Sequence, residues 1–138
     1  MVARVGIDLV SVESVRDSLR EHPTRYLNRL YTEREVTDCR IAGEVDAERL
    51  AARFAAKEAT LKVLRPTTQA VPWLTIELRR DPGGWPWLAL HGAAAELATD
   101  SGIVDLAVSL THEGAYASAV VIAEIAPAAG KALATICR

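Results

Sequence analysis

The chain has 138 residues and a formal net charge of −2, and half of its residues are hydrophobic. This length fits one domain, and the balance of charged and hydrophobic residues excludes a disordered chain. The small net charge argues against a general affinity for nucleic acid or for an anionic membrane surface.

The N-terminal segment, residues 2–12, alternates in the way that is typical of a strand. Its two faces carry different side chains, Val5, Ile7 and Leu9 on one and Gly6, Asp8 and Val10 on the other. Asp8 is unusual because a carboxylate in an apolar strand must be paired, bound to a metal or placed at the strand end. The pattern alone leaves two interpretations of Asp8, a functional group or an exposed or helix-capping carboxylate.

Three short helices are expected next, over residues 14–20, around residues 26–30 and from residue 32 to about residue 41. The third begins with a capping box, in which Thr32 is the N-cap and Glu35 follows three residues later. The first two carry a local excess of positive charge, contributed by Arg16, Arg20, Arg25 and Arg29.

A long helix that begins near Val45 or Asp46 and runs to Leu64 is the clearest expectation, because residues 49–64 contain no Gly or Pro and are rich in Ala. Asp46 is its expected N-cap, and Pro66 ends it. One stripe, expected to be buried, holds Leu50, Phe54, Lys57, Leu61 and Leu64. A neighbouring strip of small and charged residues holds Ala51, Ala55, Glu58, Lys62 and Arg65. The alanines of this strip leave room for another group to approach the helix closely.

The second half of the chain reads as strands and one helix. Strands are expected over residues 73–79, 85–90, 103–110 and 115–125, and a helix over residues 92–99. The whole predicts an α+β domain, a mostly antiparallel sheet packed on one long helix and several short helices. This domain is expected to cover residues 1–125, and residues 126–138 form an Ala-rich C-terminal tail.

Three features bear on the compartment. No apolar run approaches the roughly 18 to 20 residues of a membrane-spanning helix. The position of Asp8 argues against a secretory signal peptide. Cys39 and Cys137 lack the spacing of a metal site and are expected to be free thiols. These features predict a cytoplasmic protein.

The charged residues of the strand and the long helix allow one kind of chemistry. Asp8 and Glu58 are hard oxygen ligands of the type that binds Mg²⁺, which typically takes one or two protein carboxylates and completes its shell with water and phosphate oxygens. Lys62 would then reach a phosphate. The plain alternative is that Glu58 and Lys62 form an ion pair on the helix surface, worth about 0.3–0.5 kcal/mol.

Two other side chains have open interpretations. Lys57, within the apolar stripe, either extends its ammonium to water or is buried against a carboxylate. His112, at the end of a strand, is either solvated or part of a site. No Gly-rich phosphate loop, nucleophile elbow or zinc motif is present.

Four segments occur in an order that resembles one family: residues 6–10 (GIDLV), 30–35 (LYTERE), 53–62 (RFAAKEATLK) and 109–112 (SLTH). The chain is similar to a 4′-phosphopantetheinyl transferase of the short type, the holo-acyl-carrier-protein synthase family, from about Val5 to Glu124. The resemblance implies the fold of these transferases. It also implies transfer of the 4′-phosphopantetheine arm of coenzyme A to a serine of an apo carrier protein, with release of adenosine 3′,5′-bisphosphate. The carrier would belong to a fatty-acid, polyketide or peptide synthase.

The resemblance also implies roles for residues. Asp8 and Glu58 match the Mg²⁺ ligands, and Lys62 matches the lysine at the pyrophosphate of coenzyme A. The positions that match its nucleotide end are Arg53, Thr111 and His112. Glu58 is the first candidate for the base that takes the proton of the attacking serine, directly or through a metal-bound water, and Asp8 through such a water is the second.

Enzymes of this type are homotrimers with active sites between subunits, so a homotrimer is expected. The arginine-rich helices, with Arg16, Arg20 and Arg25, are expected to dock the acidic carrier. Two departures stand out: Ser14 where the family usually has an arginine, and Arg65-Pro66-Thr67 where it usually has Gly-Thr-Gly. The alternatives are a catalytically inactive trimeric module that binds coenzyme A or the carrier, and a purely structural domain.

Overall fold

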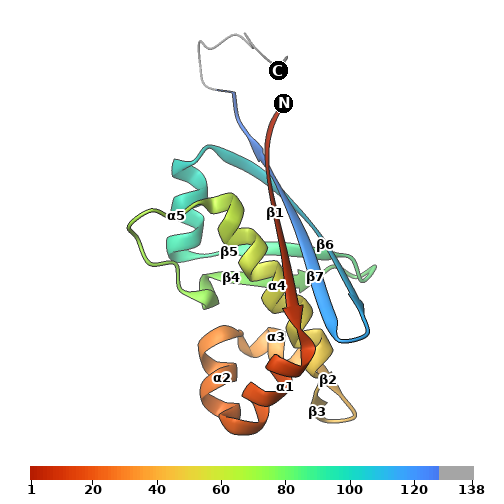
Figure 1. Ribbon diagram of the computed structural model, residues 1–138. Helices are drawn as coiled ribbons and strands as arrows, with labels where there is room; N and C mark the ends of the chain where they lie inside the picture. The colour runs from red at the N-terminus through yellow and green to blue at the C-terminus, as the bar shows by residue number, and fades with distance from the viewer. Residues whose placement is uncertain (128–138) are drawn as a thin grey trace.

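The computed structural model describes residues 1–127 (Figure 1). The first half of the chain forms β1 (Val2–Ser11), α1 (Val12–Glu21), α2 (Pro23–Leu30), α3 (Glu33–Asp38), β2 (Arg40–Ile41), β3 (Glu44–Val45) and α4 (Ala47–Leu64). The second half forms η1 (Trp73–Thr75), β4 (Ile76–Arg80), β5 (Pro86–Leu90), α5 (Gly92–Asp100), β6 (Ile103–Glu113) and β7 (Tyr116–Ile125). The predicted α+β class is confirmed.

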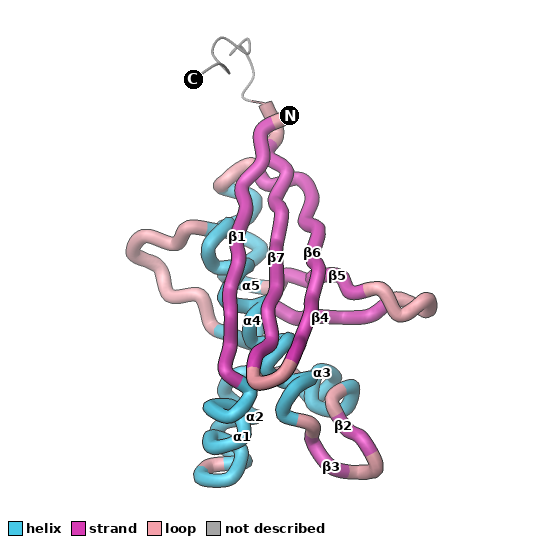
Figure 2. Tube along the Cα trace, turned by 45° about the vertical axis from the view of Figure 1, so that its right-hand side comes forward, coloured by secondary structure: helices cyan, strands magenta, loops and turns pink. Residues whose placement is uncertain are grey.

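Three long antiparallel strands form the main sheet, in the order β1-β7-β6. β7 pairs with β1 from Val2↔Ile125 to Ser11↔Tyr116 and with β6 on its other side. α4 packs against one face of this sheet, and α1, α2 and α3 gather at one end of it (Figure 2). β4 and β5 form a separate hairpin that shares no hydrogen-bonded ladder with the main sheet.

The small residues of α4 lie against the chain's own sheet. Ala51, Ala55 and Ala59 are fully buried in one core cluster with the inward side chains of β7. A Cβ on Gly6 of β1 would lie 2.0 Å from the carbonyl oxygen of Ala59, so the strand and the helix approach as closely as backbones can. The alanines of this helix therefore allow the chain's own sheet to pack closely. The sequence had suggested that they leave room for another group to approach the helix.

We expect Gly6→Ala to destabilise the protein strongly, by about 3 kcal/mol or more, because the added methyl group meets rigid backbone. The free energy of unfolding in urea measures this loss. Gly83→Ala is a matched control, since its methyl group would meet only side-chain atoms, at 3.3 Å, in an exposed turn. Equal stabilities of the two variants would contradict the close approach.

The predicted apolar stripe is only part of the buried surface of α4. Leu50 and Leu64 are buried, but Phe54 and Leu61 are only half-buried. Twelve of the eighteen residues of α4 are buried, because α1 and β4 pack against the helix in addition to the sheet. This burial on several faces of the helix explains why the charged side chains of Arg53 and Lys57 are also buried.

The ends of α4 agree with the sequence signals. Asp46 accepts a hydrogen bond from the backbone N–H of Arg49 at 2.9 Å. At the other end Arg65 adopts a left-handed conformation with a φ of 54°, just before Pro66. The Arg4 guanidinium donates to the Val63 carbonyl at 2.9 Å and satisfies one of the acceptors that a helix end leaves free.

Several boundaries differ from the prediction. α3 ends at Asp38, before the expected residue 41, because residues 40–45 turn back on themselves through Ala42 and Gly43, both with positive φ. Residues 73–75 form a 3₁₀ turn, so the strand expected over residues 73–79 begins only at Ile76.

β6 is longer than predicted, and this affects the site. It continues to Glu113 because Thr111 and His112 pair with Ser118 and Ala117 of β7. Both residues are therefore held in a strand, where the sequence suggested a connecting loop.

The remaining expectations concern the tail, the cysteines and the membrane. The predicted tail, residues 126–138, lies almost wholly outside the described residues, as does Cys137. Cys39 is a free buried thiol, as predicted, and burial raises its pKa to about 11, which makes it unreactive. Among residues 1–127 no helix is long and apolar enough to cross a membrane. The cytoplasmic location stays a prediction.

Candidate active site

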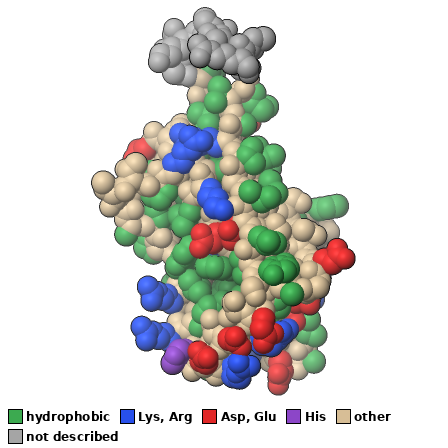
Figure 3. Space-filling view, viewed as in Figure 1, with side chains coloured by type: hydrophobic (Ala, Val, Ile, Leu, Met, Phe, Trp, Pro, Cys, Tyr) green, Lys and Arg blue, Asp and Glu red, His purple; other side chains and the backbone are tan. Residues whose placement is uncertain are grey.

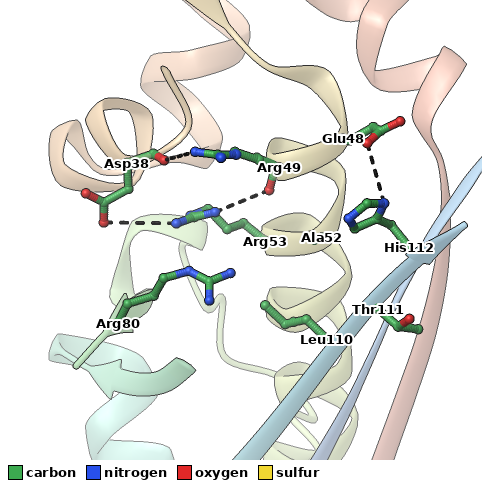
Figure 4. Close-up of a pocket in the computed structure, with 9 residues that line it drawn as sticks. All are labelled: Asp38, Glu48, Arg49, Ala52, Arg53, Arg80, Leu110, Thr111 and His112. Atoms are coloured by element: carbon green, nitrogen blue, oxygen red, sulfur yellow. Dashed lines mark hydrogen bonds and ion pairs between the residues drawn. The ribbon is translucent and has the colours of Figure 1, made fainter. Parts of the chain in front are cut away.

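A cavity of about 700 Å³ opens where α3, α4, β4 and β6 meet (Figure 4). It is lined by Asp38, Glu48, Arg49, Ala52, Arg53, Arg80, Leu110, Thr111 and His112. The predicted residues Arg53, Thr111 and His112 thus come together although they are far apart in the sequence. Three arginines and one histidine line the cavity, against two carboxylates. This excess of basic groups makes the cavity suitable for an anion.

Arg53 is the least satisfied of these groups. Its side chain is only 2% exposed, yet its nearest carboxylate is that of Asp38, with 4.0 Å between Nη2 and Oδ2. Nη1 donates to the Arg49 carbonyl at 3.4 Å, and Nε has no hydrogen-bond partner within the described part of the chain. A buried guanidinium with spare donors is costly unless a ligand supplies acceptors.

The sequence did not single out Arg49, Arg80, Glu48 or Asp38 as cavity residues. Arg80 is the last residue of β4, and its Nη1 donates to the Gly84 carbonyl at 2.7 Å. Arg80 and Arg53 extend into the same space, and His112 enters it from β6 (Figure 4). His112 Nδ1 lies 3.4 Å from Glu48 Oε2, and both side chains are exposed. The spacing of Arg49 four residues before Arg53, on one helix face, was the one available signal for a further cation.

A second group of charges lies on the other side of α4. Lys62 Nζ lies 3.3 Å from Asp8 Oδ1 and donates to the Ile7 carbonyl at 2.5 Å. Burial, and next the Asp8 carboxylate, raise the pKa of Glu58, while Lys62 opposes them. Asp8, Glu58 and Lys62 therefore form one interacting group, as the sequence suggested, and basic and acidic side chains adjoin beside β1 in Figure 3. Lys62 pairs with Asp8 across two elements instead of forming the simple helix pair with Glu58.

The residues fit Mg²⁺ better than they fit a transition metal. No group of three or more His, Cys, Asp or Glu side chains suited to a metal occurs within residues 1–127. The two neighbouring carboxylates supply hard oxygen ligands, which suit an ion that completes its shell with water and phosphate oxygens, and the Lys62 ammonium beside them is placed to bind such a phosphate. Burial is the main cause of the raised pKa of Glu58, and repulsion by the Asp8 carboxylate adds to it.

The two groups point away from each other. Lys62 follows Arg53 by nine residues, which places it about 180° around the helix and roughly 13 Å further along its axis. α4 is packed against the sheet between them. One chain therefore presents two separate charged groups on opposite sides of α4.

The predicted docking arginines lie on α1 and α2. Arg16 Nη1 lies 2.7 Å from Glu13 Oε2, and Arg20 pairs with Asp17, so each is partly neutralised within α1. Arg25 instead lines a second cavity, of about 340 Å³. The lining residues of this cavity are Ser18, Glu21, His22, Arg25, Tyr26, Arg29, Leu30 and Trp73.

Lys57 has the buried alternative of the two that the sequence allowed. Its ammonium and the carboxylate of Glu35 are both fully buried, with 2.7 Å between Nζ and Oε1. The capping box predicted at Thr32 and Glu35 is also confirmed. Glu35 was expected only as a cap, and its second role as the partner of Lys57 was not foreseen.

The chain matches known proteins over most of its length. Residues 4–121 match the family model of the 4′-phosphopantetheinyl transferase superfamily. The chain is 41% identical over 119 residues to the holo-[acyl-carrier-protein] synthase of Moorella thermoacetica, which covers 86% of this chain and 91% of the relative. It is 42% identical over 123 residues to the same enzyme of Desulforudis audaxviator, covering 89% and 93%.

Solved structures share the fold. The Chronobacterium ammoniagenes ACPS–CoA complex has a TM-score of 0.80 at 29% identity, and the match covers 92% of this chain and 100% of that one. The Helicobacter pylori holo-[acyl-carrier-protein] synthase in complex with coenzyme A has a TM-score of 0.76 at 25% identity, covering 88% and 100%. The predicted family and its fold are both confirmed. The chain belongs to the 4′-phosphopantetheinyl transferase superfamily, among the holo-[acyl-carrier-protein] synthases.

Proposed function

We propose that this enzyme transfers the 4′-phosphopantetheine arm of coenzyme A to a serine of an apo acyl carrier protein and releases adenosine 3′,5′-bisphosphate. The observation that carries the proposal is the joining of Asp8, Glu58 and Lys62 at one edge of α4. Related enzymes with this fold are known as complexes with coenzyme A. In the reaction the serine oxygen attacks the β-phosphorus, and the bond from that phosphorus to the bridging pyrophosphate oxygen breaks.

Charge neutralisation is the main task of this group, because phosphoryl transfer is helped chiefly by positioning and electrostatics. Asp8 and Glu58 would hold Mg²⁺, which would supply positive charge to the pyrophosphate. Lys62 is half exposed, so its ammonium can leave Asp8 and bind a phosphate oxygen. Glu58 is our candidate for the base that accepts the serine proton, since its raised pKa brings it closer to neutral pH.

The cavity at Arg53 would bind the nucleotide end of coenzyme A. The phosphate monoester at this end, the 3′-phosphate, offers several acceptor oxygens. These match the spare donors of Arg53 and the nearby guanidinium of Arg80. His112 would add a further donor from β6. Asp38 and Glu48 limit the excess of positive charge in the empty cavity.

A second copy of the chain is needed to complete each site. Lys62 and Arg53 lie on opposite sides of α4, so one coenzyme A molecule would use Lys62 of one chain and Arg53 of another. The outer face of the main sheet offers the contact, because Val5, Ile7 and Leu9 of β1 are each about 60% exposed and Ile122 of β7 lies beside them. Such an apolar face is typical of a subunit interface. We propose that the chain forms a homotrimer. Sedimentation equilibrium would measure the mass of this assembly.

The acidic carrier would dock at the second cavity, where Arg25 and Arg29 surround apolar side chains. Arg16 and Arg20 stay predictions as docking residues, although each already has an acidic partner. Ser14, in the place of the family's arginine, donates its backbone N–H to the Ser11 side chain and adds no charge.

We expect Arg25→Glu to raise the KM for the carrier about fivefold, equivalent to roughly 1 kcal/mol, and to leave the KM for coenzyme A unchanged. The matched variant Arg16→Glu should have a smaller effect, because Arg16 is already paired with Glu13. Steady-state kinetics at low and high salt measure both, and salt should reduce the difference. If Arg25→Glu changed both KM values equally, the docking surface would lie elsewhere.

The proposed transfer is tested by incubating the enzyme with coenzyme A, Mg²⁺ and an apo carrier protein and measuring the carrier by mass spectrometry. The expected result is a carrier heavier by one phosphopantetheine arm. The second candidate is an inactive module that binds coenzyme A or the carrier, and it is favoured by Arg65-Pro66, which stiffens the chain after α4. Binding without any gain of mass, across fatty-acid, polyketide and peptide carriers, would establish that module instead.

A further inference from the structure

The buried pair of Lys57 and Glu35 has a complete set of partners. The ammonium donates to Glu35 Oε1, to the Trp73 carbonyl at 3.0 Å and to the Ile76 carbonyl. The carboxylate also accepts from the backbone N–H of Thr32 at 3.1 Å and of Leu78 at 3.2 Å. These contacts join α3, α4, η1 and β4 at one point.

The joined elements are those that supply the charges of the anion cavity. Asp38 lies three residues after Glu35 on α3, and Arg53 lies one turn before Lys57 on α4. Arg80 ends β4, two residues after Leu78. Glu35 and Lys57 are thus each about one helical turn from a charged residue of the cavity. Leu78, which Glu35 contacts, is two strand residues from the third, Arg80.

The pair adds polar contacts that fix β4, in addition to the burial of Ile76 and Leu78 in the core. β4 hydrogen-bonds in a ladder only with β5, and neither strand is paired with the main sheet. The contacts of Lys57 with Ile76 and of Glu35 with Leu78 are polar ties from β4 to the long helix and to α3. A shift of β4 would move Arg80 relative to Arg53.

Stability alone is a weak reason to bury such a pair. The desolvation of two charges offsets much of their attraction, and apolar side chains of similar size often do as well. Burial lowers the pKa of Lys57, and the nearby Glu35 carboxylate offsets only part of this shift. The site therefore disfavours the charged ammonium on balance.

We infer that Lys57 and Glu35 are positioning residues. They hold β4 against α3 and α4 so that Arg80 and Arg53 both face the 3′-phosphate of the nucleotide. The inference rests on the proposed binding of coenzyme A in this cavity. Neither residue touches the substrate. Their effect is on its nucleotide end alone.

The test compares Lys57→Met/Glu35→Leu with the wild type, using coenzyme A and its analogue without the 3′-phosphate. The double variant leaves no unpaired buried charge and is expected to recover most of the thermal stability that Lys57→Met alone loses. We expect the KM for coenzyme A to rise on the order of tenfold, because small displacements of a binding group are costly. The KM for the analogue, the KM for the carrier and kcat should stay unchanged.

A milder variant keeps the test decisive if the double variant does not fold. Glu35→Gln keeps the shape of the side chain but has one acceptor oxygen, so it can accept from Thr32 or from Leu78 and not from both, and it loses the charge opposite Lys57. Glu33→Gln on the same helix is the exposed control. Equal changes in the KM for coenzyme A and for the analogue would overturn the positioning role. A wild type that does not distinguish the two would instead overturn the assignment of the cavity. Binding of adenosine 3′,5′-bisphosphate by calorimetry gives the same comparison without turnover.

Discussion

Glu58→Gln is expected to lower kcat by roughly 10²- to 10⁴-fold, the range attributed to a general base, and to leave the fold intact. The amide keeps the shape of the side chain but loses the negative charge that holds Mg²⁺ and the capacity to accept the serine proton. The matched control is Glu96→Gln on the exposed side of α5, which should leave the rate unchanged.

The same substitution is expected to stabilise the metal-free enzyme at neutral pH. Burial and Asp8 raise the pKa of Glu58 above its ordinary value of 4.5, so the folded chain holds this proton more tightly than the unfolded chain does. The favourable contribution is complete below pH 4.5 and disappears as the pH rises through the folded-state pKa. The variant and the wild type should therefore differ little in acid, and the variant should unfold at a higher temperature at neutral pH.

Added Mg²⁺ gives a readout that does not depend on turnover. An ion that binds only the folded wild type raises its unfolding temperature, whereas Glu58→Gln should respond much less. Thermal unfolding with and without magnesium chloride, at acid and neutral pH, measures both effects. Identical magnesium responses in the two proteins would exclude Glu58 as a ligand, whatever the loss of activity.

The sequence predicted the α+β class and most elements because its local signals are strong. The caps at Asp46 and Thr32, the Ala-rich helix and the break at Pro66 act over a few residues and hold in the structure. Boundaries failed where tertiary contacts decide, as in β6, which continues through Thr111 and His112 because β7 pairs with them.

The site was predictable only where a motif carried it. Asp8, Glu58 and Lys62 were named together from their charges and positions, the resemblance then gave them roles, and the structure brings them together. Arg80 and Asp38 had no such signal, because their place in the cavity depends on how β4 and α3 pack on α4. The partner of Lys57 was equally out of reach, since Glu35 already had a sufficient explanation as a helix cap.

Arg53→Met is expected to lower kcat/KM for coenzyme A by roughly 10- to 150-fold, because a hydrogen bond to a charged group contributes about 1.5–3 kcal/mol. The loss should fall on KM and be small for the analogue without the 3′-phosphate. Stability should be unchanged or higher, since the buried guanidinium has only a distant carboxylate and one unpartnered nitrogen within the described chain. Arg34→Met, on the exposed side of α3, is the control.

Mixing the two impaired proteins, with coenzyme A kept well below its KM so that Arg53→Met is also slow, then asks which chains form a site. If each site takes Glu58 from one subunit and Arg53 from its neighbour, mixed oligomers of Glu58→Gln and Arg53→Met contain some sites in which both halves are wild type. Random assembly from equal amounts makes about one quarter of the sites intact, so the rate should recover to about a quarter of the wild-type value. If one chain supplied both residues, every site would carry one of the substitutions, and mixing would restore nothing. The separation of Lys62 and Arg53 around α4 predicts recovery.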